Sequence, residues 1–139
     1  MTLESTIAGS WYPGKEREIR ALADEWEKRV GGEKATGDAN VPAKPNALLL
    51  PHAGWAYSGE IAWRAVRLVR DADFRRVVVL APSHRAWIEN RLVAPESGAV
   101  STPLGTIPID REWLDRLALL APVARNDRVH AAEHSAQIE

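Results

Sequence analysis

Cysteine is absent from this sequence of 139 residues, and its absence narrows the chemistry that the chain can support. Without cysteine there is no disulfide framework, no thiolate metal site and no cysteine nucleophile within these residues. A metal ion bound by this chain would therefore need histidine, aspartate, glutamate or backbone oxygen as its ligands.

The sequence also lacks an excess of charge of either sign. Its 18 lysine and arginine residues face 19 aspartate and glutamate residues, which gives a net charge of -1, and the basic residues are scattered along the chain. Proteins that bind nucleic acid electrostatically usually carry a basic stripe. We therefore expect no nucleic-acid partner.

Long apolar runs are missing as well. No stretch approaches the roughly 20 apolar residues that a membrane-spanning helix needs. Residues 1–14 also lack the basic segment followed by an apolar run that marks a signal peptide. We expect a cytoplasmic protein without membrane contact.

What the sequence does contain is the composition of one folded domain, with 45% hydrophobic and 27% charged residues. A chain of this length buries roughly two-thirds of its unfolded surface, which is enough for a single core. The composition therefore predicts one globular domain.

The spacing of apolar residues predicts an α/β fold built from βαβ units. Helical spacing predicts a surface helix over 14–30, and the Gly-, Pro- and Lys-containing run at 32–45 predicts a flexible connection. Apolar runs at 46–51 and 75–81 are typical of parallel strands buried on both faces. With a helix at about 58–70 between them, they would form part of a mostly parallel central sheet.

Capping residues and a further apolar run extend this prediction. Ser58 is a plausible N-cap for the helix between the two strands. The RLVAPE segment at 91–96 is typical of a short strand, and Asp110 is a good N-cap for a helix whose apolar face carries Trp113 and Leu117.

Two histidines follow the ends of the two expected strands. Each strand ends at a proline, and His52 and His84 follow Pro51 and Pro82 closely. Because the carboxyl ends of neighbouring parallel strands lie at one sheet edge, about 4.8 Å apart, we expect the two imidazoles to approach within about 3 to 5 Å. The pattern favours a shared metal or catalytic site, and a loop or capping role for each histidine is the alternative.

Two histidines are too few for such a site, because catalytic zinc and non-haem iron normally take three protein ligands. Glu133 and His134 are the candidates for a third group, whereas His130 is a weaker one that we expect outside the cluster. Two histidines and Glu133 would form the facial arrangement of iron(II) oxygenases. A solvated carboxylate is the alternative reading of Glu133, because charged residues near a chain end usually face water.

Aromatic residues and glycines lie close to the expected sheet edge. Trp11 and Trp55 stand beside proline or glycine turns, where they would either line a substrate pocket or close the end of the core. Gly54 is expected to permit a tight turn, and Gly59 to permit close packing where the helix begins.

Five sequence blocks resemble the Memo-like family, in the order in which that family carries them. They are AGSWYPG at 8–14, PHAGWAYSG at 51–59, LAPSH at 80–84, STPLGTIPID at 101–110 and EHSAQIE at 133–139. The family includes protein B of the AmmeMemoRadiSam system and is related in fold to class III extradiol ring-cleaving dioxygenases.

The resemblance implies a dioxygenase-like fold in which His52 and His84 bind the metal, Trp11 lies at the pocket and His134 takes the place of an active-site histidine. Family members are about twice this length, and a late cysteine in their second half is the third metal-site residue. The resemblance therefore implies that residues 1–139 are a truncated, N-terminal part of a single Memo-like domain. Its unfinished sheet edge would favour self-association.

Two functions are compatible with these features. The first is a redox or dioxygenase-like protein with an iron or copper ion on His52 and His84, and with His134 as a general acid or base. The second is a non-catalytic peptide- or partner-binding module that depends on Trp11 and Trp55, with the radical SAM and AMMECR1-like proteins of the same system as partners. Without a rigid third ligand, we expect the isolated chain to bind metal weakly and to show little turnover.

Overall fold

The computed structural model describes residues 1–31 and 45–138 and shows a mixed α/β protein. Its elements are β1 Thr2–Leu3, α1 Glu16–Val30, α2 Trp55–Val66, β2 Leu92–Ala94, β3 Ala99–Thr102, β4 Gly105–Pro108, α3 Arg111–Ala118, β5 Val123–Arg125, α4 Asp127–Ala132 and α5 Ser135–Ile138. Among the described residues, no helix is both long and apolar enough to cross a membrane. The connection predicted at 32–45 falls outside them, apart from its last residue.

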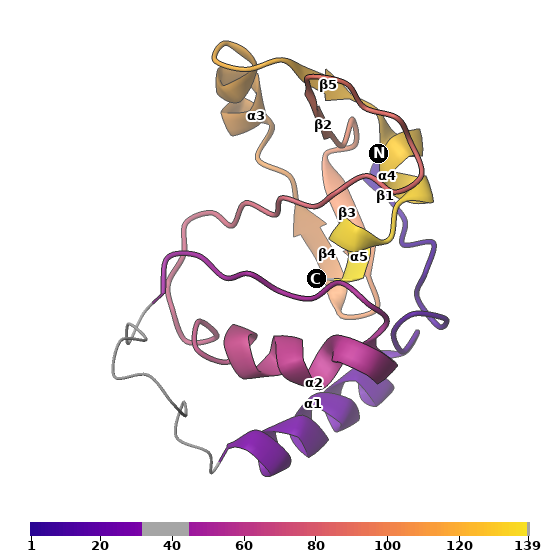
Figure 1. Cartoon of the computed structure of the whole chain (residues 1–139), viewed down its shortest axis with the longest axis vertical. Coiled ribbons are helices and arrows are strands. Elements are labelled where there is room, and N and C mark those ends of the chain that lie inside the picture. The colour runs from indigo at the N-terminus through magenta and orange to yellow at the C-terminus, as the bar shows by residue number, and fades with distance from the viewer. Residues whose placement is uncertain (32–44, 139) are drawn as a thin grey trace.

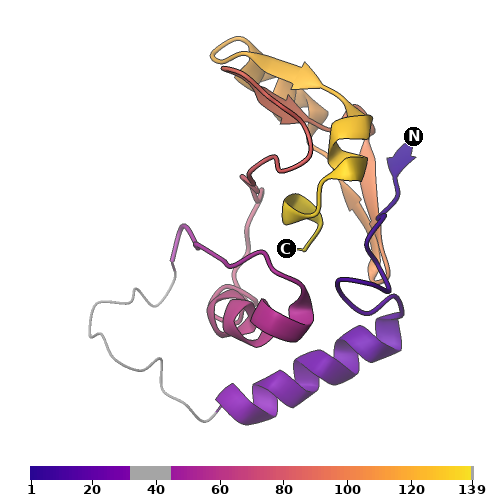
Figure 2. The ribbon, with the colours of Figure 1, turned by 45° about the vertical axis from the view of Figure 1, so that its right-hand side comes forward.

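The elements gather into two groups. Figure 1 shows α1 and α2 packed together at one end of the molecule, and the strands with α3 and α4 toward the other. The turned view of Figure 2 places α5 between the two groups. The C-terminal segment therefore lies where residues from both groups can meet.

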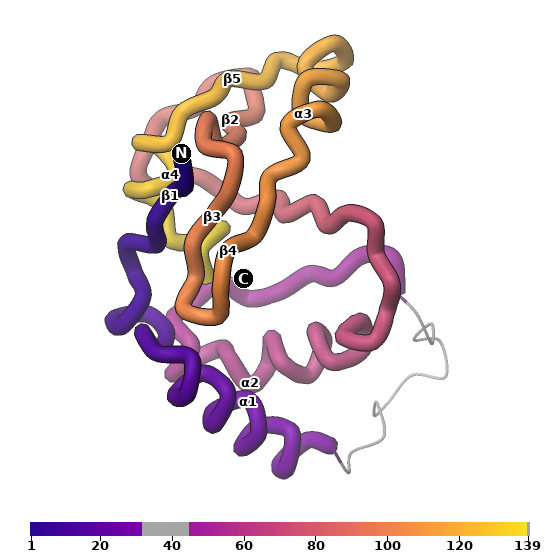
Figure 3. The backbone as a smooth tube through the Cα atoms, turned by 180° about the vertical axis from the view of Figure 1, so that it is seen from behind, coloured from indigo at the N-terminus to yellow at the C-terminus, as the bar shows by residue number. Residues whose placement is uncertain are grey.

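Strand pairing is mostly parallel. β1 pairs with β3 in parallel, with Thr2 opposite Ala99, and β2 pairs with β5 in parallel, with Leu92 opposite Val123. β3 and β4 form an antiparallel hairpin, and Figure 3 shows its two strands running beside each other from behind. The predicted α/β character and mostly parallel pairing are therefore confirmed.

The two strands predicted at 46–51 and 75–81 do not form, so the predicted βαβ unit is wrong. Both segments run as coil, and neither makes a backbone hydrogen bond to another described residue. Their apolar side chains are largely exposed, with Leu49 at 99%, Leu80 at 80% and Val77 at 73%. An apolar run indicates a tendency toward burial, but it does not supply the neighbouring strand whose N–H and C=O groups a ladder requires.

Two of the helices predicted from spacing are confirmed with small changes at their ends. α1 buries Ile19, Trp26 and Val30 on one face, as an amphipathic surface helix should. Asp110 caps α3 as predicted, because its side chain accepts a hydrogen bond from the backbone N–H of Trp113 at 2.9 Å.

The helix α2 is also confirmed, but it begins and ends earlier than 58–70. Gly54 is its N-cap, and the backbone N–H of Trp55 donates to the carbonyl of Trp11 at 2.8 Å. Ser58 is therefore not the N-cap. It lies inside the first turn, and its hydroxyl donates to the carbonyl of Ala53 at 3.0 Å.

Tryptophans fill the space between α1 and α2. The ring of Trp26, which is 5% exposed, lies 5.5 Å from that of Trp55 and 6.4 Å from that of Trp63. The Trp63 indole nitrogen donates to Glu27 at 3.0 Å. A Cβ atom on Gly59 would lie only 2.4 Å from the Trp26 ring, so the close packing predicted for this glycine is confirmed.

We expect Gly59→Ala to destabilise the protein by about 1 to 3 kcal/mol, because the added methyl group would push the Trp26 ring out of its packed position. Urea unfolding followed by tryptophan fluorescence measures the change. Gly98→Ala is the matched control, since its Cβ would meet no atom closer than 4.0 Å. Equal stability of the two variants would contradict the packing described here.

The carboxylate of Asp127 ties α4 to the turn before β3. It accepts hydrogen bonds from the Ser97 hydroxyl at 2.6 Å and from the backbone N–H groups of Ser97 and Glu96 at 3.0 and 2.8 Å. The Ser97 hydroxyl is the main cause that lowers the pKa of Asp127 below the usual value of 3.8. These bonds therefore stabilise the ionised carboxylate in the folded state.

This lowered pKa predicts an acid-sensitive contact. The stabilisation is fully present above the unfolded-state pKa and is lost as the pH falls through the lower folded-state pKa. We expect Asp127→Asn to flatten the pH dependence of the unfolding free energy in the acid range, measured by urea unfolding from about pH 2.5 to 6. The exposed Asp24 on α1 provides the control Asp24→Asn, and an equal flattening there would contradict the prediction.

Candidate metal centre

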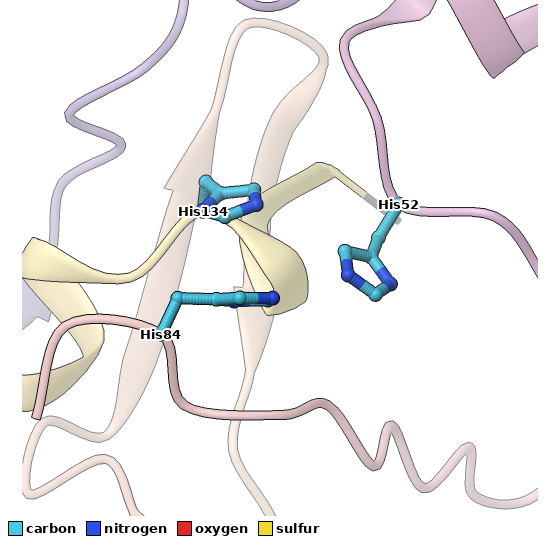
Figure 4. Close-up of side chains that lie close together, drawn as sticks. All are labelled: His52, His84 and His134. Carbon is cyan, nitrogen blue, oxygen red and sulfur yellow. The ribbon is translucent and has the colours of Figure 1, made fainter. Parts of the chain in front are cut away.

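Three histidines from distant parts of the chain lie together, and we call them the histidine cluster (Figure 4). His52 precedes α2, His84 follows the coil segment 75–81, and His134 lies between α4 and α5. One ring nitrogen of each lies within 4.8 Å of those of the other two. The ring centroids are 5.2 Å apart for His52 and His84, 4.6 Å for His84 and His134, and 5.9 Å for His52 and His134.

The predicted approach of His52 and His84 is confirmed, but the elements that carry them are coil and not the ends of paired strands. Local hydrogen bonds hold these segments. The bond from Trp55 to the carbonyl of Trp11 fixes the chain after His52. The buried Ser135 hydroxyl donates to the carbonyl of Pro82 at 2.6 Å and fixes the chain before His84.

Glu133 is a buried carboxylate beside the cluster, with a side chain 7% exposed. Its Oε1 lies 2.9 Å from Nδ1 of His84 and 3.1 Å from Nδ1 of His134. Oε2 accepts from the backbone N–H groups of His84 and Arg85, and Oε1 accepts from those of His134 and Ser135. Burial alone would raise the pKa of this carboxyl group, but the bonds from His84, Ser135 and His134 hold it well below its usual range.

The sequence predicted Glu133 either as a third metal ligand or as a solvated carboxylate. The structure instead places it behind two of the histidines, where it accepts hydrogen bonds. It is not solvated, since its side chain is 7% exposed, and among the described residues the group that could hold a metal ion consists of the three histidines without it. Sequence reasoning missed this orienting position. Two of its donors, the N–H groups of His134 and Ser135, directly follow it in the sequence, but no local signal indicates the other two, those of His84 and Arg85.

A sequence model of the Memo-like protein family matches residues 4–139. The chain belongs to the Memo-like family. It is 30% identical to a MEMO1 family protein of Thermotoga maritima and 26% identical to one of Thermoplasma volcanium, each over 100% of this chain and over 52% and 49% of the relative. A MEMO1 family protein of Thermococcus onnurineus is 33% identical over 96% of this chain and 44% of its own length. The chain thus spans about half the length of the curated relatives it matches.

The two tryptophans predicted near the pocket of this Memo-like chain lie in different surroundings. Trp11 is 37% exposed, and its ring lies 4.4 Å from the ring of His134. Trp55 packs against Tyr12 and Trp26, and its indole nitrogen donates to the carbonyl of Ile138 at 2.9 Å. Trp11 therefore borders the histidine cluster, whereas the polar atom of Trp55 is already bonded within the protein.

His130 is the fourth histidine of the Memo-like chain, and the structure places it apart from the other three, as predicted. Its Nε2 lies 3.0 Å from the carbonyl oxygen of Val93. Because a carbonyl oxygen can only accept, Nε2 of His130 carries the hydrogen. This histidine links α4 to β2.

The donor set of the histidine cluster fits a transition metal. Imidazole nitrogen suits iron, copper, nickel and zinc. Ligands about 2.1 Å from one metal ion lie roughly 3 to 4 Å apart, so nitrogens within 4.8 Å of one another are slightly spread. The exposed ring of His84 leaves the cluster open to a ligand from solvent.

Proposed function

We propose that this Memo-like chain binds a divalent transition metal, iron or copper, through His52, His84 and His134. The convergence of three ring nitrogens within 4.8 Å of one another carries the proposal. Neutral imidazoles supply all three ligands, as in the three-histidine sites of metalloenzymes. In this proposal His134 is a metal ligand. The role that the sequence predicted for it, a general acid or base, is the alternative.

The proposed reaction class is redox or dioxygenase-like, on a fold related to the class III extradiol dioxygenases. A bound iron or copper ion would supply the redox chemistry and the open coordination position. The protein would supply three fixed imidazoles, a buried carboxylate behind two of them and an aromatic wall at Trp11. The half-exposed Trp11 ring would shield one side of the site from water.

Metal analysis tests the proposal. We expect anaerobically purified wild-type protein to take up about one iron(II) or copper ion per chain, and the double variant His52→Ala, His84→Ala to take up none. Equal metal content in the two proteins would contradict the proposal. The sequence predicted weak binding for lack of a rigid third ligand, whereas the site of three histidines proposed here predicts one-to-one binding by the chain alone. Calorimetric titration of the wild type distinguishes the two.

The second candidate is a non-catalytic module that binds a peptide or a partner protein. The exposure of Trp11 beside His134 favours it, because exposed aromatic rings are common anchors of binding surfaces. Radical SAM and AMMECR1-like proteins of the AmmeMemoRadiSam system are the proposed partners. Binding to such a partner should fall on Trp11→Ala and survive chelation, and the opposite pattern would contradict this function.

We also propose that the chain is the N-terminal part of a single Memo-like domain and that it self-associates. The sequence predicted self-association through an unfinished sheet edge, but the strands expected at 46–51 and 75–81 are coil, and we propose these apolar segments as the contact surface instead. The exposure of Leu49, Val77 and Leu80 supports this. Sedimentation analysis should show dimers or larger species that dissociate in the double variant Leu49→Ser, Leu80→Ser. A monomeric wild-type protein would contradict self-association.

A further inference from the structure

The hydrogen bond between Glu133 and His84 bears on which nitrogen of the His84 ring carries the proton. Glu133 holds His84 twice, once through the backbone N–H at Oε2 and once through ring Nδ1 at Oε1, 2.9 Å away. The glutamate side chain is 7% exposed, whereas that of His84 is 40% exposed. A buried group thus fixes the orientation of a ring that solvent reaches.

Every contact that the structure gives the Glu133 carboxylate comes from a nitrogen. Backbone N–H groups of four residues donate to its two oxygens, and these residues are His84, Arg85, His134 and Ser135. A carboxylate surrounded by N–H donors can only accept. Nδ1 of a neutral His84 ring must therefore carry the hydrogen, and its Nε2 must carry the free lone pair.

Figure 4 shows how the three rings face one another. One ring nitrogen of His84 and one of His134 lie on the side of their rings that faces His52. Since Nδ1 of both rings lies at Oε1 of Glu133, the nitrogen remaining for the cluster is Nε2 in each. Only a deprotonated nitrogen can bind a metal ion.

We propose that Glu133 is a positioning residue that keeps the neutral ring of His84 in the Nδ1–H form, with the Nε2 lone pair directed into the histidine cluster. The benefit of this tautomer to the protein rests on the metal function proposed above. The tautomer itself is expected whether or not a metal ion binds. A carboxylate behind a ligating histidine orients the ring and raises its basicity as a ligand. The other oxygen of the same carboxylate accepts a hydrogen bond from the backbone N–H of His84, so Glu133 holds both the ring and the main chain of this residue.

The chain contains its own reference for this inference. His130 donates from Nε2 to the carbonyl of Val93, so its neutral ring has the opposite tautomer, with the hydrogen on Nε2. Long-range proton–nitrogen correlation spectra of the metal-free, nitrogen-15-labelled chain distinguish the two forms for neutral rings. We expect His84 to give the Nδ1–H pattern and His130 the Nε2–H pattern in the same spectrum.

An Nε2–H pattern for His84 in the wild type would overturn the proposal without any variant. In Glu133→Gln, the amide group replaces one acceptor oxygen by an N–H donor, so we expect His84 to give a mixture of tautomers. Iron(II) affinity should fall about 10- to 100-fold, the usual effect of losing such an outer partner. Unchanged tautomers in a folded Glu133→Gln protein would also overturn the proposal.

Asp127→Asn is the matched control. Asp127 is likewise a carboxylate that accepts backbone and side-chain hydrogen bonds, but its partners are Glu96 and Ser97. We expect the His84 pattern and iron(II) affinity of this variant to equal those of the wild type. A wild-type protein that shows the Nδ1–H form of His84 but binds neither iron(II) nor copper would overturn the metal function and leave the role of Glu133 in place.

Discussion

Replacing His134 by alanine should weaken iron(II) or copper binding by more than about a hundredfold, which exceeds the usual effect of losing an outer partner of a ligand. The reason is that the histidine cluster has only three ring nitrogens in reach of a common point, and His134 supplies one of them. Calorimetric titration of anaerobic protein measures the change. His52→Ala and His84→Ala should show losses of the same order.

His130→Ala is the control for this series, because the His130 ring bonds to the carbonyl of Val93 and lies apart from the cluster. We expect its metal affinity to match the wild type. Wild-type affinity in His134→Ala, with weak binding in His84→Ala, would show that His134 is not a ligand. It would then fit the general acid or base that the sequence predicted.

The largest effect on stability is expected for Trp26→Ala, at about 3 to 5 kcal/mol. The Trp26 ring is 5% exposed and fills the space between Trp55, Trp63 and Gly59, so its removal leaves a cavity between α1 and α2. A small domain is stable by only about 5 to 15 kcal/mol, so the variant should unfold at much lower urea concentration.

Trp87→Ala is the matched control, because the Trp87 side chain is 92% exposed and little packing is lost when it is removed. We expect its unfolding midpoint to lie close to that of the wild type. A similar loss of stability in the two variants would show that Trp26 does not hold the two helices together.

The helices α1, α2 and α3 could be predicted because their apolar spacing lies within their own residues, whereas the polar segment that forms α4 and α5 was not predicted to be helical. The spacing of Ile19, Trp26 and Val30 marks the buried face of α1, and Asp110 marks the start of α3. Strands are different, because each needs a partner from elsewhere in the chain. The short strands β1 and β5 carry little local signal, and the strong apolar runs at 46–51 and 75–81 have no partner among the described residues.

The candidate site could be predicted in part for a similar reason. His52 and His84 follow the same kind of apolar, proline-ended segment, and that repetition indicated that they would lie together although the strands themselves do not form. The position of Glu133 depends on folding, because the N–H groups of His84 and Arg85 reach it from 49 and 48 residues away in the chain. No local pattern around Glu133 shows that these donors will arrive.

The three histidines of the cluster lie far apart in the sequence, on segments that the rest of the fold holds only by a few hydrogen bonds. A metal bound to all three would act as a reversible cross-link that closes two long loops at one point. Because the three ring nitrogens meet only in the folded chain, the ion binds the folded state in preference to the unfolded one and stabilises it by mass action. Occupancy of the site would then be coupled to the folding of the whole chain, so that chelation loosens the protein as well as emptying the site.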